Sequence, residues 1–223
     1  MDKRAFYRDP RVAGSYEDRR SASPAGRLAQ ELELAAVRRA FGPREKVVEL
    51  ACGTGRLMRT LLGEGWDVRG IDQSPEMLAA GGGDAGGRLL VGDVFRLPLP
   101  DRAADGLFCF RFTNHYAELG GFFRECSRVL RPGGTLVCDS MRWSPLLWDS
   151  PRLGGRNHCA ADRRIAAWLE EAGFAVESVE PLFPIGPYLL GRLPLALARL
   201  LLGGRGLIPA RLQAVAVWLA RRR

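Results

Sequence analysis

Apolar positions follow two different periods along most of this chain. Short apolar runs that contain β-branched residues predict buried strands, whereas apolar residues that recur every three or four positions predict one buried face of a helix. The predicted strands cover residues 47–50, 67–72, 89–91, 104–110, 135–138 and 175–182. Predicted helices follow the first, second, fourth and fifth of these strands. Strands that alternate with helices predict an α/β domain built on a largely parallel sheet.

The two ends of the chain have their own patterns. Residues 1–24 are polar, charged and rich in turn formers. A helix is predicted from Ser23 to about Phe41, where a Gly-Pro pair ends it. Residues 194–202 predict a short amphipathic helix, and 214–220 are apolar on both faces, which favours a buried last strand.

The stretch Val47–Arg56 predicts a strand, a glycine turn and the start of a helix. Such a unit presents backbone N–H groups and a helix N-terminus to a ligand above the strand end. Gly53 and Gly55 can adopt positive φ, and without a Cβ they let a ligand approach the backbone closely. Met58 stands at the third glycine position of a dinucleotide fingerprint, which argues against a bound pyrophosphate, and no P-loop lysine follows. A tight connection that binds no ligand is the alternative reading of this turn.

Three motifs together resemble one enzyme family. The sequence Glu-Leu-Ala-Cys-Gly-Thr-Gly at 49–55 is similar to the first motif of class I S-adenosylmethionine-dependent methyltransferases. Leu97–Asp101 and Arg128–Gly134 resemble the Leu-Pro-Phe-Pro-Asp connection and the Arg-Val-Leu-Lys-Pro-Gly-Gly turn of the type-11, quinone-biosynthesis-like branch. The resemblance covers about residues 44–182. It implies a Rossmann-like doubly wound seven-stranded, mostly parallel sheet with an antiparallel last strand, and S-adenosylmethionine as cofactor.

The resemblance also assigns expected roles to acidic residues at the strand ends. Asp72, at the end of the second predicted strand, is expected to accept both ribose hydroxyls, since its two oxygens match two vicinal donors. Asp93 is expected to accept from the adenine amino group, with Val94 stacked on the ring. The full expected cofactor set is Tyr16, Glu49, Ala51, Cys52, Gly53, Thr54, Gly55, Asp72, Gln73, Met77, Asp93, Val94, Phe110 and Arg111.

The same resemblance divides the chain into three parts of one domain. Residues 1–43 are expected to form an N-terminal cap and helix, which in many relatives folds over the cofactor. Residues 44–183 form the cofactor-binding methyltransferase core, and 184–223 form a basic, apolar cover segment with the last strand. Tyr16 and Arg27 of the N-terminal part are candidates for ligand contact, or equally a surface tyrosine and a solvated arginine.

Composition narrows the class of protein. Hydrophobic residues make up 47% and charged residues 26% of 223, which is ordinary for a globular domain. No apolar run reaches the roughly 18–20 residues of a membrane span, and no signal-peptide pattern opens the chain. The five cysteines are scattered, odd in number and without a Cys-x-x-Cys pair, so we expect a cytoplasmic protein with reduced thiols, no disulfides and no metal site.

Positive charge is concentrated at the C-terminal end. The net charge is +8 and the sequence pI is about 9.8. Residues 181–223 contain seven arginines and no acidic residue, which leaves 26 basic against 25 acidic residues in the first 180. The excess therefore lies in an apolar tail instead of a polar arm.

His115 is the candidate catalytic residue. It lies in the loop 111–116 after the fourth predicted strand, where ligands of open parallel sheets bind. A histidine there can act as a general base near neutral pH, bind the substrate, or simply pack. His158 is expected to be structural. Methyl transfer itself depends mainly on positioning and water exclusion.

The C-terminal segment suggests the acceptor. Leucines at helical spacing in 190–201, Phe183, Tyr188 and the tryptophans at 143 and 148 suggest a cover over a small, apolar or lipid-like substrate. Arg192, Arg199, Arg205 and Arg211 suggest peripheral contact with anionic membrane at the inner face. The alternative is packing of these leucines on the sheet or on a partner subunit. A nucleic-acid methyltransferase is a weaker alternative, because no Asn/Asp-Pro-Pro-Tyr/Phe motif or added RNA-binding module is present, and a non-catalytic cofactor-binding protein is another.

Overall fold

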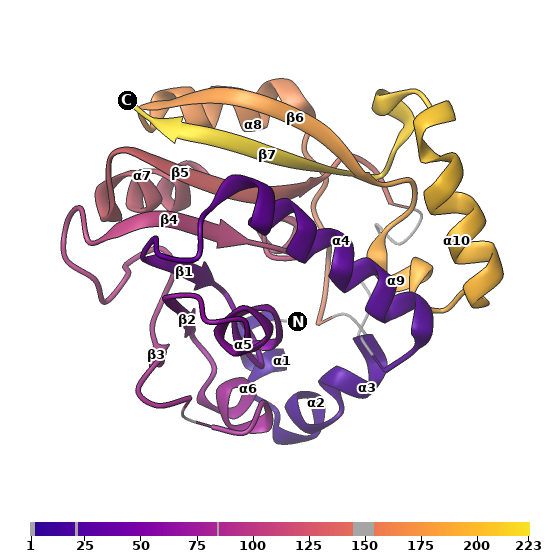
Figure 1. The fold of residues 1–223 in the computed structure, drawn as a ribbon, viewed down its shortest axis with the longest axis horizontal. Helices are drawn as coiled ribbons and strands as arrows, with labels where there is room; N and C mark the ends of the chain where they lie inside the picture. Colours follow the sequence, from indigo (N-terminus) through magenta and orange to yellow (C-terminus); the bar gives the residue numbers. More distant parts are fainter. Residues whose placement is uncertain (1–2, 21, 84, 145–153) are drawn as a thin grey trace.

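One twisted seven-stranded sheet runs through the protein. The computed structural model describes residues 3–20, 22–83, 85–144 and 154–223. The strands are β1 (Val47–Leu50), β2 (Val68–Asp72), β3 (Leu89–Val91), β4 (Ala104–Cys109), β5 (Leu130–Met141), β6 (Phe174–Phe183) and β7 (Val215–Arg222). Their order is β3-β2-β1-β4-β5-β7-β6 (Figure 1). β7 pairs antiparallel with both β5 and β6, and the remaining pairs are parallel. The predicted fold class, with its antiparallel last strand, is confirmed.

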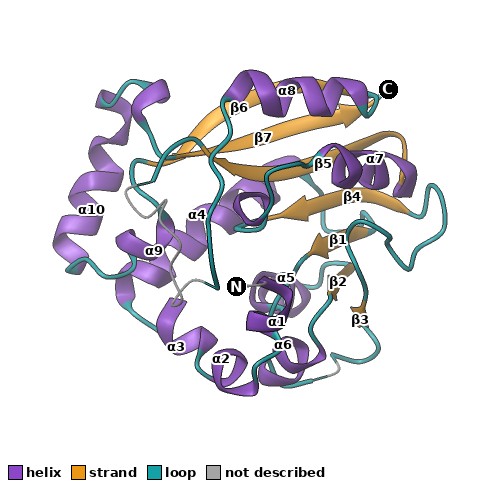
Figure 2. Ribbon diagram, turned by 180° about the vertical axis from the view of Figure 1, so that it is seen from behind, coloured by secondary structure: helices purple, strands orange, loops and turns teal. Residues whose placement is uncertain are grey.

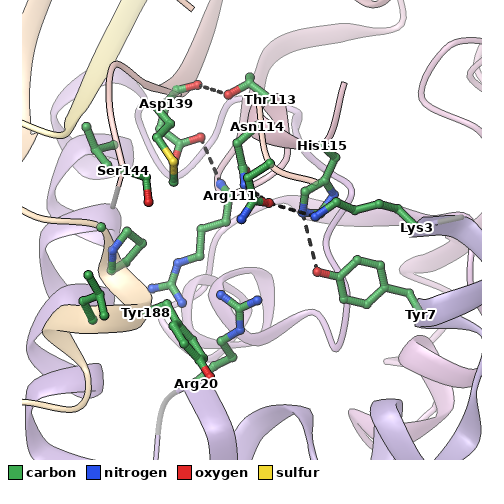
Figure 3. A pocket seen from close by; sticks show the side chains of 16 residues that line it. Lys3, Tyr7, Arg20, Arg111, Thr113, Asn114, His115, Asp139, Ser144 and Tyr188 are labelled. Carbon is green, nitrogen blue, oxygen red and sulfur yellow. Dashed lines mark hydrogen bonds between the residues drawn. The ribbon is translucent and has the colours of Figure 1, made fainter. Parts of the chain in front are cut away.

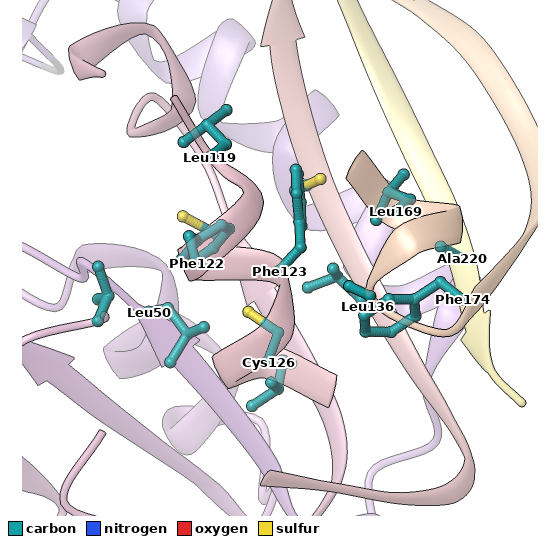
Figure 4. Packing of buried hydrophobic residues seen from close by; sticks show 14 of the residues in the cluster. Leu50, Leu119, Phe122, Phe123, Cys126, Leu136, Leu169, Phe174 and Ala220 are labelled. Atoms are coloured by element: carbon teal, nitrogen blue, oxygen red, sulfur yellow. The ribbon is translucent and has the colours of Figure 1, made fainter. Parts of the chain in front are cut away.

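Helices cover both faces of this sheet (Figure 2). The longer ones are α4 (Pro24–Ala40), α5 (Arg56–Gly63), α6 (Pro75–Ala80), α7 (Gly120–Val129), α8 (Asp162–Glu171) and α10 (Leu195–Gly203). Residues from α7 and α8 form one hydrophobic cluster with the sheet, and residues from α4, α5 and α10 form the other. In the first cluster, Phe122 and Phe123 of α7 are fully buried, and Phe123 lies on the side of Leu136 and Phe174 (Figure 4). Each such side chain contributes about 1.5–3 kcal/mol by leaving water.

The N-terminal segment is more regular than its sequence indicates. Residues 1–24 are expected to be turn-rich, but α1 (Lys3–Tyr7), α2 (Pro10–Gly14) and α3 (Tyr16–Arg20) lie there. Asp9 caps α2 by accepting a hydrogen bond from Arg11 N at 2.8 Å. Helices of five residues are too short to show a period, and isolated ones are marginal in water, so their packing against the core decides them.

One turn also differs from the prediction. The fifth strand is predicted to begin at Thr135 after two left-handed glycines, but β5 begins at Leu130. Only Gly133 of this pair has positive φ, at 74°. A Cβ on Gly134 would lie 2.8 Å from the carbonyl oxygen of Arg131, so Gly134 is needed for close packing of backbone against backbone.

The C-terminal segment folds back beside α4. α9 (Pro187–Leu190) and α10 contact α4, with Leu190 and Leu202 buried there. Leu197 and Leu200, on the other side of α10, are exposed, Leu200 to 71%. The predicted helix at 194–202 and the predicted last strand are thus confirmed, whereas only part of the leucine set packs on the protein.

Candidate functional site

The turn between β1 and α5 carries three left-handed residues. Ala51, Gly53 and Gly55 have φ values of 51°, 59° and 72°. Glu49, buried at the end of β1, accepts a hydrogen bond from Met58 N at 2.8 Å and so holds the first turn of α5. Burial raises the pKa of Glu49 to about 8, against the lowering effect of that hydrogen bond.

Asp72 joins this turn to the end of β2. Its Oδ2 accepts from Gly53 N at 2.7 Å, and its Oδ1 accepts from Ser74 N at 2.9 Å. Burial raises the pKa of Asp72, while the backbone donors act in the opposite direction. The carboxylate therefore fixes the spacing between two adjacent strand ends at the carboxyl edge of the sheet.

A cavity of about 560 Å³ opens at this edge. Nine of the fourteen expected cofactor residues line it, together with the candidate catalytic residue. The nine are Tyr16, Ala51, Gly53, Asp72, Gln73, Met77, Val94, Phe110 and Arg111. We call this space the donor cavity. Its walls combine a carboxylate, a left-handed glycine and apolar side chains.

The other five expected residues do not line the donor cavity. Glu49 and Gly55 shape the turn, Cys52 packs inside, and the Thr54 hydroxyl donates to the Glu17 carboxylate. Asp93 accepts from Phe95 N at 2.9 Å and pairs with Arg4 at 3.1 Å. Its carboxylate thus joins the connection after β3 to α1, and its expected contact with the adenine amino group stays a prediction.

Two residues that line the donor cavity were not predicted from the sequence. Tyr7 comes from α1, and Phe112 follows Arg111 in the loop after β4. Phe112 continues an apolar strand, which was a usable signal. Tyr7 lies in a segment without periodicity, so nothing local marked it.

A second cavity, of about 620 Å³, adjoins the donor cavity (Figure 3). Tyr7, Arg111 and His115 line both, so these three residues form a common wall. The second cavity is otherwise lined by Lys3, Arg20, Thr113, Asn114, Asp139, Met141, Ser144, Asn157, Gly186, Pro187, Tyr188, Leu189 and Val215. We call it the acceptor cavity.

His115 sits in the common wall on a short 3-10 helix, Thr113–His115. The ring of Tyr7 stacks on it, with centroids 5.4 Å apart and 24° between planes, and the Tyr7 hydroxyl lies 3.5 Å from His115 Nε2. Burial, and after it the positive charges of Lys3 and Arg20, lower the pKa of His115 well below its usual 6.5. The imidazole is therefore neutral at neutral pH. Burial also raises the pKa of Tyr7 to about 12.

A buried ion pair fixes the other part of this wall. Arg111 has a left-handed φ of 61°, and its N–H donates to Asp139 Oδ1 at 2.9 Å. Its guanidinium donates to both oxygens of Glu33, a fully buried residue of α4, at 2.6 and 2.9 Å. Burial, with the charge of Glu33, raises the pKa of Asp139 to about 7. The sequence held one signal for Glu33: an acid on the apolar stripe of a helix.

The remaining aromatic and histidine predictions have mixed outcomes. Tyr188 lines the acceptor cavity, but Phe183 is buried in the core. Trp143 is partly exposed, and its Nε1 donates to Leu212 O at 2.7 Å. Trp148 lies outside the described residues. His158 is placed by its backbone N–H, which donates to Asn114 O at 2.8 Å.

Two further features concern membranes and metals. Within the described ranges, no helix is both long and apolar enough to cross a bilayer. Among the same residues, no group of three or more histidine, cysteine or acidic side chains is arranged to hold a metal ion.

The fold of this chain is the Rossmann-like fold found in S-adenosylmethionine-dependent methyltransferases. A structure from Thermotoga maritima described as an S-adenosylmethionine-dependent methyltransferase, possibly a histamine N-methyltransferase, matches with a TM-score of 0.69 at 19% identity, covering 96% of this chain and 98% of that one. Residues 48–138 of the chain match the methyltransferase-domain model of the type-11 family.

Two relatives in sequence cover different parts of the chain. An uncharacterised 37.1 kDa protein in transposon Tn4556 of Streptomyces fradiae is 30% identical over 187 residues, 75% of this chain and 54% of that protein. The demethylmenaquinone methyltransferase of Tropheryma whipplei is 37% identical over 99 residues, 42% of this chain and 40% of the enzyme. The chain thus spans about half the length of the curated relatives it matches, or less.

Proposed function

We propose that this protein transfers a methyl group from S-adenosylmethionine to a small acceptor molecule. The observation that carries the proposal is the common wall of Tyr7, Arg111 and His115 between the two cavities. A donor in one cavity and an acceptor in the other would meet at this wall, with water excluded from the contact.

The residues of the donor cavity fit this cofactor. Gly53 offers a left-handed backbone with no Cβ, and an added Cβ would come within 3.2 Å of Met77. Asp72 presents a carboxylate held in place by two backbone donors, which suits a ribose diol. Val94, Met77 and Phe110 provide apolar walls for a flat ring. When bound, the cofactor supplies an electrophilic methyl group on a sulfonium.

We propose that His115 accepts the proton that an acceptor hydroxyl, amine or acidic C–H gives up. Its neutral imidazole is in the required form at neutral pH, and its place in the common wall faces both cavities. Asp139, whose pKa of about 7 suits proton transfer, lines the acceptor cavity and is the second candidate for this role.

The acceptor cavity supports a partly apolar acceptor. Met141, Pro187, Leu189 and Val215 give one apolar side, and Tyr188 adds an aromatic ring. Pockets for small ligands commonly combine such surface with a few placed polar groups. The Tropheryma relative is a demethylmenaquinone methyltransferase by name, which is consistent with a small apolar acceptor.

The test begins with cofactor binding measured by calorimetry. We expect a micromolar-range dissociation constant for S-adenosylmethionine (about −8 kcal/mol) and no binding of NADH. Gly53→Ala should weaken binding about tenfold or more, because its Cβ takes space in the donor cavity. The matched control is Gly65→Ala, which has the same left-handed strain (φ 85°) with open space around its Cβ. Equal loss in both variants, or none in either, would contradict the donor assignment.

The second step identifies the acceptor. The protein is incubated with methyl-labelled cofactor and a total small-molecule and lipid extract, and the labelled product is isolated. We expect a labelled small molecule. Label only in nucleic acid, or binding of cofactor without any labelled product, would overturn the proposed acceptor class or the catalysis itself.

We also propose that α10 and the segment after it touch an anionic lipid surface. Leu200 and Leu207 are exposed, to 71% and 90%. The exposed Arg199 precedes Leu200, and the exposed Arg211 precedes the exposed Leu212. Apolar side chains flanked by cations without acidic neighbours fit anionic headgroups, at about 1 kcal/mol for each arginine near the surface.

Co-sedimentation with vesicles containing phosphatidylserine tests this surface. Binding should decrease with added salt and with Arg199→Glu/Arg211→Glu, because the attraction is electrostatic. Arg163→Glu, an exposed arginine on α8, is the matched control and should leave binding unchanged. Absence of binding at low salt would remove the membrane from the proposal and leave the methyl transfer in place.

A further inference from the structure

Three positive side chains line the acceptor cavity. Lys3, Arg20 and Arg111 line the cavity, and the guanidinium groups of Arg20 and Arg111 both point into it (Figure 3). Among the described lining residues, Asp139 is the acid, and its pKa of about 7 leaves it only partly ionised at neutral pH. The cavity therefore holds more positive than negative charge.

The three cations differ in how they are neutralised. Arg111 has its counterion in Glu33, which it contacts through two hydrogen bonds. Lys3 donates to Asn157 Oδ1 at 2.8 Å. Arg20 lies over the rings of Tyr16 and Tyr188, with its Cζ 5.5 and 5.3 Å from the centroids. Within the described part of the chain, no carboxylate lies within ion-pair distance of Arg20.

The charge continues outward from Arg20 into a neighbouring hollow. That hollow shares Tyr7, Arg20 and Tyr188 with the acceptor cavity and is further lined by Arg19 and Arg192. The Cζ of Arg192 lies 4.0 Å from the Tyr188 centroid, so two guanidinium groups contact one tyrosine ring. No acid lines the described part of this hollow.

Like charges held this close together raise each other's energy unless an anion lies between them. The aromatic rings of Tyr16 and Tyr188 contact the guanidinium groups, but a cation–π contact does not neutralise their charge. The pKa of His115 in the common wall, which burial and then the charges of Lys3 and Arg20 lower, is a second sign of positive potential in this cavity. An oxyanion is the ligand that guanidinium groups recognise best.

We infer that the acceptor carries an anionic oxygen group, a carboxylate or a phosphate, that binds at Arg20 where the acceptor cavity meets the outer hollow. The apolar part of the acceptor then lies against Met141, Leu189 and Val215, and its reacting atom lies at the common wall. This inference rests on the proposed function for its use of the acceptor cavity. It goes further by naming the charge of the substrate and the residue that selects it.

The test uses three probes with the same alkyl chain: octanoate, octyl phosphate and octanol. Each is titrated calorimetrically into the protein at low salt. At least one anion should bind about tenfold to a hundredfold more tightly than octanol, the range expected for a hydrogen bond to a charged group. Preference for octanoate or for octyl phosphate tells which oxyanion the site favours.

Variants place the effect at Arg20. Arg20→Gln should reduce anion affinity to that of octanol, and Arg192→Gln should reduce it less. Arg11→Gln is the control, because Arg11 is exposed on α2 and pairs with Asp9. The far-ultraviolet circular dichroism spectrum of each variant shows whether it is folded. If Arg20→Gln does not fold, the inference stands only if Arg192→Gln lowers the affinity for the anion.

The inference is overturned if octanol binds as tightly as both anions, or if Arg20→Gln keeps the anion affinity of the wild type. Its failure is separate from failure of the proposed function. Loss of the proposed function would appear as no binding of S-adenosylmethionine to the wild type, whereas the anion preference is read from probes that need no cofactor.

Discussion

The buried ion pair between Glu33 and Arg111 is expected to stabilise the common wall of the two cavities, and this can be tested by substitution. Glu33 is fully buried, and the Arg111 side chain is 11% exposed. Replacing Glu33 with glutamine removes the negative charge but keeps the size of the side chain. A guanidinium is then left in a site of low dielectric with no full counterion, and removal of one partner of a buried pair costs about 3–5 kcal/mol.

The assay is urea unfolding followed by far-ultraviolet circular dichroism at neutral pH. The matched control is Glu64→Gln, since Glu64 pairs with Arg38 of the same helix α4, at 2.5 Å. That pair is about one-third exposed on each side, so its loss should cost no more than about 1 kcal/mol. The two variants thus compare a buried and a solvated pair on one helix.

A double variant measures the interaction energy between Glu33 and Arg111. Glu33→Gln/Arg111→Met removes both charges, and its loss of stability should be smaller than the sum of the single losses by about 1–3 kcal/mol. Two results would show that the Glu33–Arg111 pair does not stabilise the common wall. Either Glu33→Gln unfolds at the same urea concentration as the control, or the stability losses of the two single variants simply add.

Three other changes have defined outcomes. Asp72→Ala should weaken binding of S-adenosylmethionine by about 1–3 kcal/mol, measured by calorimetry, because the ribose loses its acceptor. His115→Ala should keep cofactor affinity but lower turnover about a hundredfold or more, whereas the control His158→Ala should not, in a methyl-transfer assay with the identified acceptor. Glu49→Gln should make the free energy of unfolding depend less on pH. The pKa of Glu49 is about 8 in the folded protein and 4.5 in the unfolded chain. The stability that protonated Glu49 contributes is therefore complete below pH 4.5 and is lost as the pH rises towards 8. Over the roughly 2.5 units from pH 4.5 to neutrality, this loss is about 3 kcal/mol, and an unchanged slope in the variant would contradict the raised pKa.

Local sequence determined the strands and turns of the central sheet. Strand periodicity and turn chemistry act over a few residues. The sequence therefore predicts the strand Val47–Leu50, the turn with Gly53 and Gly55, and the position of Asp72 at a strand end. The antiparallel last strand and the family followed from motifs of the same short range. The cavity lining predicted from them includes nine residues that do meet in space.

Tertiary structure alone decided what the strand ends and the N-terminal helices do together. Tyr7 stacks on His115 across 108 positions of the chain, and Glu33 meets Arg111 across 78. Arg4 of α1 pairs with Asp93 after β3, a contact that no local pattern indicated. Periodicity tells which face of an element is buried, but not which distant residue lies opposite, because that depends on how all the elements pack at once. The charge of the acceptor cavity belongs to this second kind of information, since Lys3, Arg20 and Arg111 come from three elements that only the fold brings to one place.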